Sequence, residues 1–335
     1  MPGPPPAHLA TIRRGTALEA VVRGHIAVVD AGGRILSGAG DPGAVTTLRS
    51  CVKALQALPF VRHAAAQLGV STEELAIACS SHNGELVHVE TVLRLLNRAG
   101  LSEAALRCGP QQPMDQESAW AIMAAGQQPG RIHNNCSGKH AAMLAVCTVR
   151  GWPIDGYTAA GHPLQAEVRE VMGTLGGVDL DSAPAGIDGC GLPTYGVSLG
   201  VLARMFAAAC ADAGFRRCQD AMAAHPYLVA GRGRFDTALL SLGGRDLTAK
   251  GGAAAVWVAV RRPDGPALAI KLEAGEQAAL PAVALAALDR LGWIGEGALE
   301  AADLAPFRHP TLRNWEGTAV GSITVEPGWI EGLAA

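Results

Sequence analysis

The 335-residue sequence contains very little lysine. Lysine and arginine together number 27, and only four of these residues are lysines. Arginine keeps its proton in a protein, whereas lysine can act as a base or a ligand once its pKa is lowered. Three of the four lysines lie in short motifs rich in glycine, serine or cysteine, at residues 50–53, 136–140 and 249–252. These lysines are therefore candidates for functions that require a neutral amine.

Strong charge and long hydrophobic runs are also missing, and each absence excludes a class of partner. The formal net charge of −3 provides no basic surface for nucleic acid or anionic lipid. No uncharged apolar run reaches the roughly 18 residues of a membrane-spanning helix, so no membrane partner is expected. Residues 1–16 are predicted to form a proline-rich arm, without the charged and apolar regions of a signal peptide. We therefore expect a cytoplasmic protein.

The eight cysteines include no CxxC pair, and most are expected to be packed as small hydrophobic thiols in a reducing compartment. Cys136 and Cys190 differ because glycine and polar residues flank them. Two soft thiolates and a neutral nitrogen would suit Zn²⁺, and three protein ligands leave a fourth position for water or substrate. Spacing alone favours His140 as the nitrogen donor. The alternatives are two free thiols or a Cys136–Cys190 disulfide.

Strands are expected near both ends of the chain, with helices between them. The expected strands are residues 18–22, 26–29, 34–36, 253–261, 267–272 and 319–325, together with a buried strand at 75–79. The economical assembly is an α+β fold with a central, mostly antiparallel sheet, built from N- and C-terminal segments and flanked by helices. Residues 17–335 are predicted to form a single catalytic domain, with a helical sub-region at about 86–215.

Ser50 and Lys53 lie three residues apart on a predicted helix, so their side chains share a face. A serine hydroxyl is a poor nucleophile until a base takes its proton, and a buried lysine can be that base. The lysine pKa must then fall from about 10.4 toward 7–8, which corresponds to roughly 4 kcal/mol. Burial and a cationic neighbour such as Arg49 could supply this shift. The alternative is an ordinary exposed pair, because a single Ser-x-x-Lys also occurs by chance.

Two further polar segments are candidates for site chemistry. Residues 80–85, Ser-Ser-His-Asn-Gly-Glu, follow the predicted strand at 75–79, where functional residues are common, although a simple polar turn is the alternative. Lys250 is followed by two glycines and a predicted strand. This arrangement loosely resembles the Lys-Thr-Gly element that accompanies Ser-x-x-Lys in serine β-lactamases and penicillin-binding proteins. A glycine pair also allows a close approach to the backbone.

Taken together, these motifs resemble the rhizobial-type L-asparaginases, often labelled L-asparaginase II. The motifs occur in the order of that family, and the set is specific although each is weak singly. They are Ser-x-x-Lys at 50–53, Ser-His-Asn-Gly-Glu at 81–85, Cys-Ser-Gly-Lys-His at 136–140, Asp-Gly-Cys-Gly-Leu-Pro-Thr at 188–194 and Pro-Tyr-Leu-Val-Ala-Gly at 226–231. The resemblance extends from about residue 17 to residue 325.

The resemblance implies a homodimer that hydrolyses L-asparagine to L-aspartate and ammonia, with a fold similar to serine β-lactamases and glutaminases. In this family two Ser-Lys pairs form the catalytic centre, and the matching positions are Ser50 with Lys53 and Ser81 with Lys250. Ser81 is preferred to Ser80 because it directly precedes the His-Asn-Gly-Glu run. Lys250 is preferred to Lys271, which lacks the glycine context.

The resemblance also implies a zinc ion held by two cysteines and a lysine, matching Cys136, Cys190 and Lys139. Further residues are expected to contact the substrate, namely Arg49, His82, Asn83, Glu85, His140 and Asp188. The mechanism expected from these residues is acyl transfer, with Ser50 as nucleophile and Lys53 as its base. The alternative functions are a related amidase or glutaminase, a penicillin-binding-type acyl-enzyme and a non-catalytic zinc-binding regulator.

Overall fold

A computed structural model describes residues 3–263, 265–295 and 297–334. The chain divides into two compact units, and each is discontinuous in sequence. Unit 1 comprises Met1–Cys51, Gly196–Cys210 and Arg245–Ala335, and unit 2 comprises Val52–Tyr195 and Ala211–Gly244. The helical sub-region expected at about 86–215 therefore differs from unit 2, which begins earlier and takes in a later segment.

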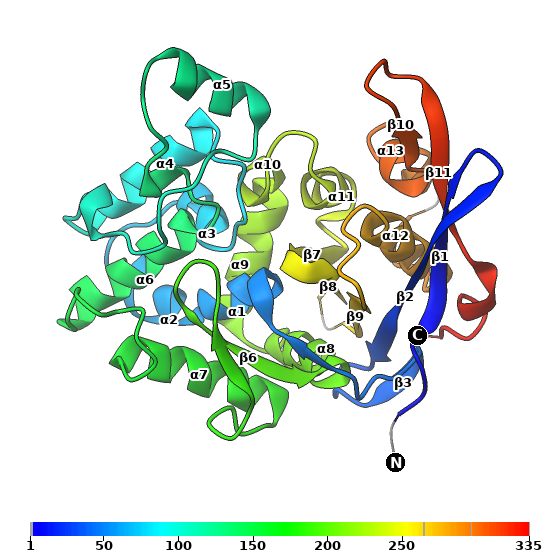
Figure 1. The fold of residues 1–335 in the computed structure, drawn as a ribbon. Helices are drawn as coiled ribbons and strands as arrows, with labels where there is room; N and C mark the ends of the chain where they lie inside the picture. The colour runs from blue at the N-terminus through cyan, green and yellow to red at the C-terminus, as the bar shows by residue number, and fades with distance from the viewer. Residues whose placement is uncertain (1–2, 264, 296, 335) are drawn as a thin grey trace. The chain divides into compact units, whose positions relative to one another are not determined.

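Unit 1 is built around one sheet with the strand order β10-β11-β1-β2-β9-β8-β7, and β3 pairs with β2. Every pair of neighbouring strands is antiparallel. The N-terminal strands lie between C-terminal ones, as the blue and red strands of Figure 1 show. The α+β fold with an antiparallel sheet made from both ends of the chain is thus confirmed. The strands are β1 (Ala7–Arg14), β2 (Ala17–Val29), β3 (Ile35–Ala39), β7 (Leu247–Gly252), β8 (Val256–Arg261), β9 (Ala267–Leu272), β10 (Thr311–Arg313) and β11 (Ala319–Val325).

The central strands of this sheet are apolar on both faces, which explains their continuous hydrophobic runs. Ile26 of β2 pairs with Ile270 of β9, and both are completely buried. Helix α8 (Leu199–Ala209) packs against β2, β8 and β9, while α12 (Leu280–Arg290) packs against β11 and α13 (Ala305–Arg308).

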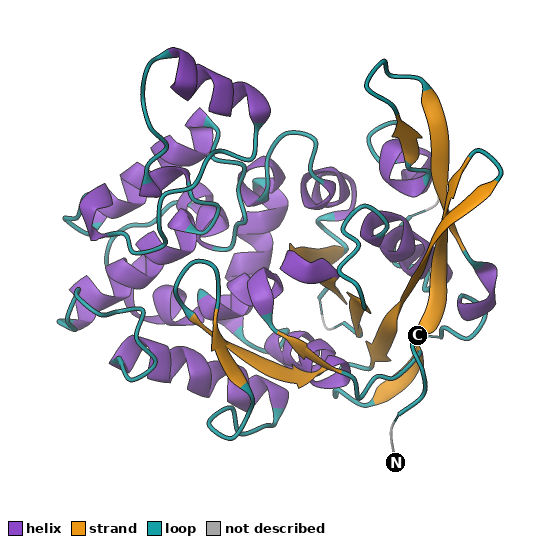
Figure 2. Cartoon of the chain, viewed as in Figure 1, coloured by secondary structure: helices purple, strands orange, loops and turns teal. Residues whose placement is uncertain are grey.

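Unit 2 is mainly helical, as the purple elements of Figure 2 show. Its central helix, α6, is buried along most of its length and packs against α2, α3, α4 and α7. The main helices are α1 (Lys53–Gln56), α2 (Leu58–Phe60), α3 (Thr72–Ala78), α4 (Leu86–Arg98), α5 (Gln116–Ala124), α6 (Ser137–Arg150), α7 (Pro163–Gly176), α9 (Ala213–Ala224), α10 (Pro226–Val229) and α11 (Phe235–Gly243). The short strand β5 (Ala185–Ile187) pairs with the beginning of β6 (Pro193–Ser198).

One predicted strand is wrong, because residues 75–79 belong to helix α3 and its C-terminal cap. A short apolar run fits a buried helix as well as a buried strand. The structure decides for the helix through a capping box: the Ser71 hydroxyl accepts a hydrogen bond from the Glu74 N–H, and the Glu74 carboxylate accepts one from the Ser71 N–H.

Six strands of the described chain were not predicted from the sequence, namely β1, β4 (Val45–Thr47), β5, β6, β7 and β10. Part of the expected N-terminal arm forms β1, which lies between β2 and β11 in the sheet. Lys250 lies within strand β7, whereas the prediction placed it before the next strand. In the described part of the chain, no helix has the length and apolar character needed to cross a membrane.

Candidate functional site

The three lysines of the predicted motifs are all buried. Lys53, Lys139 and Lys250 are 0%, 3% and 1% exposed, whereas Lys271 is partly exposed. Burying an amine costs free energy unless polar groups surround it, so each of these side chains requires a specific environment. Three of the four lysines in the sequence thus lie in the interior.

Arg49 and Ser50, which belong to unit 1, begin the short 3₁₀ helix η1 (Arg49–Val52). Arg49 has a φ of +35°, in the left-handed region that non-glycine residues rarely adopt. Backbone strain of this kind is concentrated at functional sites. The strained residue immediately precedes the serine that the sequence singles out.

The end of strand β7 packs directly against this helix. A Cβ on Gly252 would lie only 3.1 Å from the Cys51 amide nitrogen and 3.3 Å from the Arg49 Cβ. Because Gly252 has no side chain, the backbone of η1 can lie close to the end of β7. The glycine pair at 251–252 predicted a close backbone approach of this kind. Lys250 lies two residues earlier on β7, and its Nζ donates a hydrogen bond to the Gly251 carbonyl at 2.7 Å.

Lys271, the alternative to Lys250, lies on β9 at the edge of this buried region. Its Nζ donates hydrogen bonds to the carbonyls of Ala254 at 2.6 Å and Leu272 at 2.5 Å. Burial lowers the pKa of Lys271, while the charge of Glu273 opposes the shift. Lys250 is buried much more deeply than Lys271, which agrees with the preference derived from its motif.

In unit 2, Lys53 is the first residue of α1 and is surrounded by acceptors. Its Nζ donates hydrogen bonds to the carbonyls of Ser80 at 2.5 Å and Asn135 at 3.1 Å. It also forms a side-chain hydrogen bond with Cys136. Lys53 therefore connects the polar loop at 80–85 to the cysteine motif that precedes α6.

The two adjacent serines of the polar loop have different environments. The Ser80 hydroxyl donates a hydrogen bond to the Ile77 carbonyl at 2.7 Å. The Ser81 hydroxyl is buried, and within the described residues it has no hydrogen-bond partner. A buried hydroxyl without a partner is costly, and it is typical of a position that a ligand or water completes. This difference supports Ser81 over Ser80 as the functional residue.

His82 is fixed by the protein itself. Its Nδ1 accepts a hydrogen bond from the Gly84 N–H at 3.1 Å, and its Nε2 lies 2.9 Å from the Ser137 hydroxyl oxygen. Burial lowers the pKa of His82 well below its ordinary value, and the charges of His88 and Lys53 add to the effect. The ring is therefore neutral, and both nitrogens are engaged in internal bonds. Asn83 and Glu85 are also buried and hydrogen-bonded within unit 2.

Cys136, Lys139 and Cys190 come together although 51 residues separate the last two. The Lys139 Nζ lies 3.3 Å from the Cys190 sulfur. A hydrogen bond between the two cysteines, together with the charges of Lys53 and Lys139, lowers the pKa of Cys136 well below its usual value against the effect of burial. The same hydrogen bond and burial raise the pKa of Cys190. All eight cysteines are free, so the alternative disulfide is not formed.

The charged groups of this cluster oppose the effect of burial on Lys139. Burial acts to lower the pKa of Lys139, but the charges of Cys136, Cys190 and Asp188 outweigh it and raise the pKa overall. Asp188 is half-buried, and one of its carboxylate oxygens accepts a hydrogen bond from the Gly189 N–H at 2.8 Å. Gly138 lies in the first turn of α6, which packs against α3. A Cβ at this position would clash with the Ile77 carbonyl of α3, so the close approach of the two helices requires glycine.

The donor set can be compared with the geometry of a zinc site. Zn–S distances of about 2.3 Å and Zn–N distances of about 2.0–2.1 Å place the N and S ligands of a tetrahedral site roughly 3.6 Å apart. The observed separation of 3.3 Å between Lys139 Nζ and Cys190 Sγ is within a few tenths of an ångström of that value. Across the described residues, no group of three His, Cys, Asp or Glu side chains is placed to hold a metal. A metal site at these cysteines would therefore depend on the lysine.

His140, which spacing favours as the nitrogen donor, faces a tyrosine. Its Nδ1 lies 2.6 Å from the Tyr157 hydroxyl oxygen, which accepts a further hydrogen bond from the Arg107 N–H at 3.0 Å. Burial, with the charges of Lys139 and Lys53, lowers the pKa of His140 well below its ordinary value. We infer that Tyr157 donates to Nδ1, so that Nε2 carries the proton. Within the described residues Nε2 is buried without a partner, which suits a group that donates to a ligand.

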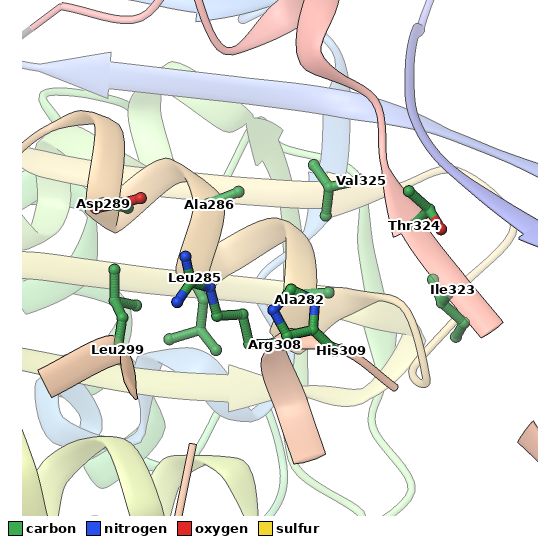
Figure 3. A pocket seen from close by; sticks show the side chains of 10 residues that line it. All are labelled: Ala282, Leu285, Ala286, Asp289, Leu299, Arg308, His309, Ile323, Thr324 and Val325. Atoms are coloured by element: carbon green, nitrogen blue, oxygen red, sulfur yellow. The ribbon is translucent and has the colours of Figure 1, made fainter. Parts of the chain in front are cut away.

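A separate hollow of about 220 Å³ in unit 1 contains none of the predicted site residues. Figure 3 shows its mainly apolar side chains, which come from α12, β11 and the neighbourhood of α13. In the strand order, β11 lies five positions from β7, the strand that carries Lys250. This hollow is therefore distinct from the region of Lys250.

Buried amines, together with a buried serine hydroxyl that has no partner among the described residues, are typical of an enzyme. The family model for L-asparaginase II matches residues 10–325. The chain belongs to the L-asparaginase II family, as its motifs predicted. Membership supports amidohydrolase activity on asparagine in general. A comparison with curated proteins found no match.

Proposed function

We propose that this chain hydrolyses L-asparagine to L-aspartate and ammonia through two Ser-Lys pairs, Ser50 with Lys53 and Ser81 with Lys250. The observation that carries the proposal is the environment of Lys53. Its amine is completely buried, and it donates to the carbonyl of Ser80, the residue next to the unpartnered Ser81 hydroxyl. Proton transfer requires a lysine held in a fixed position and a hydroxyl that is not already hydrogen-bonded, and these residues supply both groups.

The proposed reaction is acyl transfer. The Ser50 oxygen attacks the carbonyl carbon of the asparagine side chain, and neutral Lys53 accepts the hydroxyl proton. The C–N bond then breaks, and ammonia leaves with a proton relayed through Ser81 and Lys250. Water hydrolyses the resulting ester, which releases aspartate and restores Ser50. Backbone N–H groups, including that of Ser50, would stabilise the oxyanion, and one such donor contributes about 3–4 kcal/mol.

We further propose that Cys136, Lys139 and Cys190 hold a zinc ion near this centre. The support is the donor set itself, two sulfurs and one amine whose N–S separation fits tetrahedral coordination. Bound there, zinc would offer its fourth coordination position to the α-carboxylate or the neutral α-amino group of asparagine. His140 Nε2 is suited to donate to the same end of the substrate, and the half-buried Asp188 carboxylate is suited to accept from it.

Replacing the proposed nucleophile tests the reaction directly. Ser50→Ala should lower kcat for ammonia release from L-asparagine by at least about 10³-fold, because no other hydroxyl takes over the attack. Circular dichroism should be unchanged, and Ser241→Ala, at an exposed position on α11, should retain normal activity. Activity of the Ser50→Ala enzyme within tenfold of the unmodified enzyme would exclude this role. Equal or faster ammonia release from glutamine would instead favour a glutaminase.

The homodimer, the cytoplasmic location and the requirement for zinc stay predictions. The remaining substrate contact expected from the resemblance is Arg49, which lies beside Ser50 on η1 in unit 1. Its strained backbone supports a role in the site, because such conformations persist where the surrounding structure holds them.

A further inference from the structure

The motif Pro-Tyr-Leu-Val-Ala-Gly at 226–231 has no role in the proposed reaction, yet it lies beside the loop that carries Ser81. The Ser81 N–H donates to the Val229 carbonyl at 2.9 Å, and the Asn83 N–H donates to the Ala230 carbonyl at 2.8 Å. Two backbone hydrogen bonds therefore align the polar loop with the end of α10 and the residue that follows it. All these residues belong to unit 2.

The carboxylate of Glu85 is enclosed by the same segment. One oxygen accepts hydrogen bonds from the Arg232 N–H at 3.0 Å and from the Asn83 side-chain amide at 3.2 Å. The other oxygen accepts a short hydrogen bond from the Tyr227 hydroxyl. Gly231 has a φ of +115°, and a Cβ there would clash with Glu85. Glu85 is 6% exposed, so its carboxylate serves the protein and has little room for a substrate.

Tyr227 is itself held in place. Its ring stacks on His88 with centroids 5.8 Å apart, and His88 stacks on His82 at 5.1 Å. The His88 Nε2–H donates to the Tyr227 carbonyl at 3.1 Å. Burial and the bond to Glu85 raise the pKa of Tyr227, so the phenol keeps the proton that it donates.

We propose that Tyr227 is a positioning residue, which acts through Glu85 to hold the Ser81 loop in its reactive geometry. The inference rests on the proposed function of Ser81. A hydroxyl-to-carboxylate hydrogen bond is charge-assisted and is about twice as strong as a neutral one. Glu85 lies four residues beyond Ser81, and the backbone bonds of Ser81 and Asn83 extend the attachment. Catalytic groups need such support, because small displacements cost large factors in rate.

The test removes one oxygen atom. Tyr227→Phe keeps the ring stack on His88 but loses the donor to Glu85. We expect kcat for L-asparagine to fall about tenfold with KM changed less than twofold, since the geometry of the reacting groups is altered rather than substrate binding. Thermal unfolding of this variant should remain cooperative. Glu73→Gln, at an exposed position on α3, is the matched control and should keep normal kcat, because its carboxylate pairs with the exposed guanidinium of Arg94.

A double-mutant cycle tests the route through Glu85. Glu85→Gln retains an acceptor for the Arg232 N–H and should keep more kcat than Glu85→Ala. Adding Tyr227→Phe to Glu85→Ala should cause no further loss of kcat, because the hydrogen bond between the two side chains is already absent.

Three results would overturn the inference. They are a Tyr227→Phe enzyme that keeps kcat within twofold, an undiminished effect of Tyr227→Phe in the Glu85→Ala background, and equal inactivity of Glu85→Gln and Glu85→Ala. Ser81→Ala separates the two proposals: normal activity there would reject the function of Ser81, whereas an inactive Ser81→Ala with a normal Tyr227→Phe would reject only the positioning role.

Discussion

At the scale of the residue, the cluster of two thiols and one amine in unit 2 is the most unusual chemistry in the chain. Lys139 and Cys136 lie on the first turn of α6 and at its N-terminal cap, and Cys190 comes from a distant loop. A thiolate and an ammonium that share a buried site stabilise each other only while both remain charged. Binding a metal would require the lysine to release its proton, so metal affinity should depend on pH.

Removing one sulfur tests whether this cluster binds zinc. Cys136→Ala deletes one of three protein ligands, and zinc per chain after dialysis should fall from about one to below about 0.1. The measurement is elemental analysis of the purified protein. Cys147→Ala is the matched control, because Cys147 lies on the same helix as a buried thiol whose pKa burial raises to about 11. Equal zinc in the two variants, or no zinc in the unmodified protein, would contradict the proposal.

Residue type alone predicted which lysines are buried but not how polar groups pair. Lys53, Lys139 and Lys250 were singled out by their motifs, and all three lie in the interior. His82 and Glu85 were expected to contact substrate, yet their polar atoms are engaged in internal hydrogen bonds. Hydrogen-bond partners of a buried side chain come from segments far away in sequence, so spacing within a motif cannot reveal them. Among the candidate residues that the structure describes, the Ser81 hydroxyl and the His140 Nε2 are buried without a partner, and only the structure reveals this.

At the scale of the element, helix α3 explains why the polar loop begins where it does. The capping box formed by Ser71 and Glu74 starts the helix, and its apolar residues Leu75–Ala78 are buried. The signal for this box was present in the sequence as Ser-Thr-Glu-Glu ahead of the apolar run. Hydrophobicity dominated the prediction, although a run of this length cannot separate helix from strand. The capping-box sequence would have favoured a helix over a strand at these residues.

Loss of this cap should be measurable locally. Ser71→Ala removes the acceptor for the Glu74 N–H, which costs about 1 kcal/mol of helix stability. Opening of the first turn should then be about fivefold more frequent, so amide hydrogen exchange across residues 72–79 should be faster by that factor. Mass spectrometry of the corresponding peptide reports the rate. Ser102→Ala is a suitable control, because Ser102 precedes the 3₁₀ helix η3 (Glu103–Ala105) without a side-chain cap bond. Unchanged exchange in the Ser71→Ala protein would show that tertiary packing, and not the cap, holds α3.

At the scale of the whole molecule, the sequence was sufficient to predict that both chain ends share one sheet. Apolar runs near each end, such as those around Ile26 and Ile270, could not be buried except against each other. The sequence did not reveal β1 or β7, because proline before one and glycine in the other masked their periodicity. Nor did it reveal that residues 196–210, which form the end of β6 and α8, belong to unit 1. Membership of a unit depends on which surfaces fit together, and hydrophobic periodicity does not encode it.

The sheet of unit 1 makes a prediction about fragments of the chain. A fragment ending at Gly244 keeps β1, β2 and β3 but lacks β7–β11, which include the partners β9 and β11. Its remaining strands would expose long unpaired edges and apolar faces, so the fragment should be insoluble when expressed alone. Co-expression with residues 245–335 should restore a soluble complex, measured by co-purification through a tag on one fragment.

The ladder between β2 and β9 provides the control for this experiment. Ile270 on β9 lies opposite Ile26 on β2, and proline at that position would remove a backbone donor within the sheet. A 245–335 fragment that carries Ile270→Pro should therefore fail to rescue the longer fragment, although its composition is almost unchanged. Rescue by both versions would mean that nonspecific hydrophobic contact suffices. Rescue by the unmodified version alone would show that the two ends of the chain are joined by strand pairing in a fixed register.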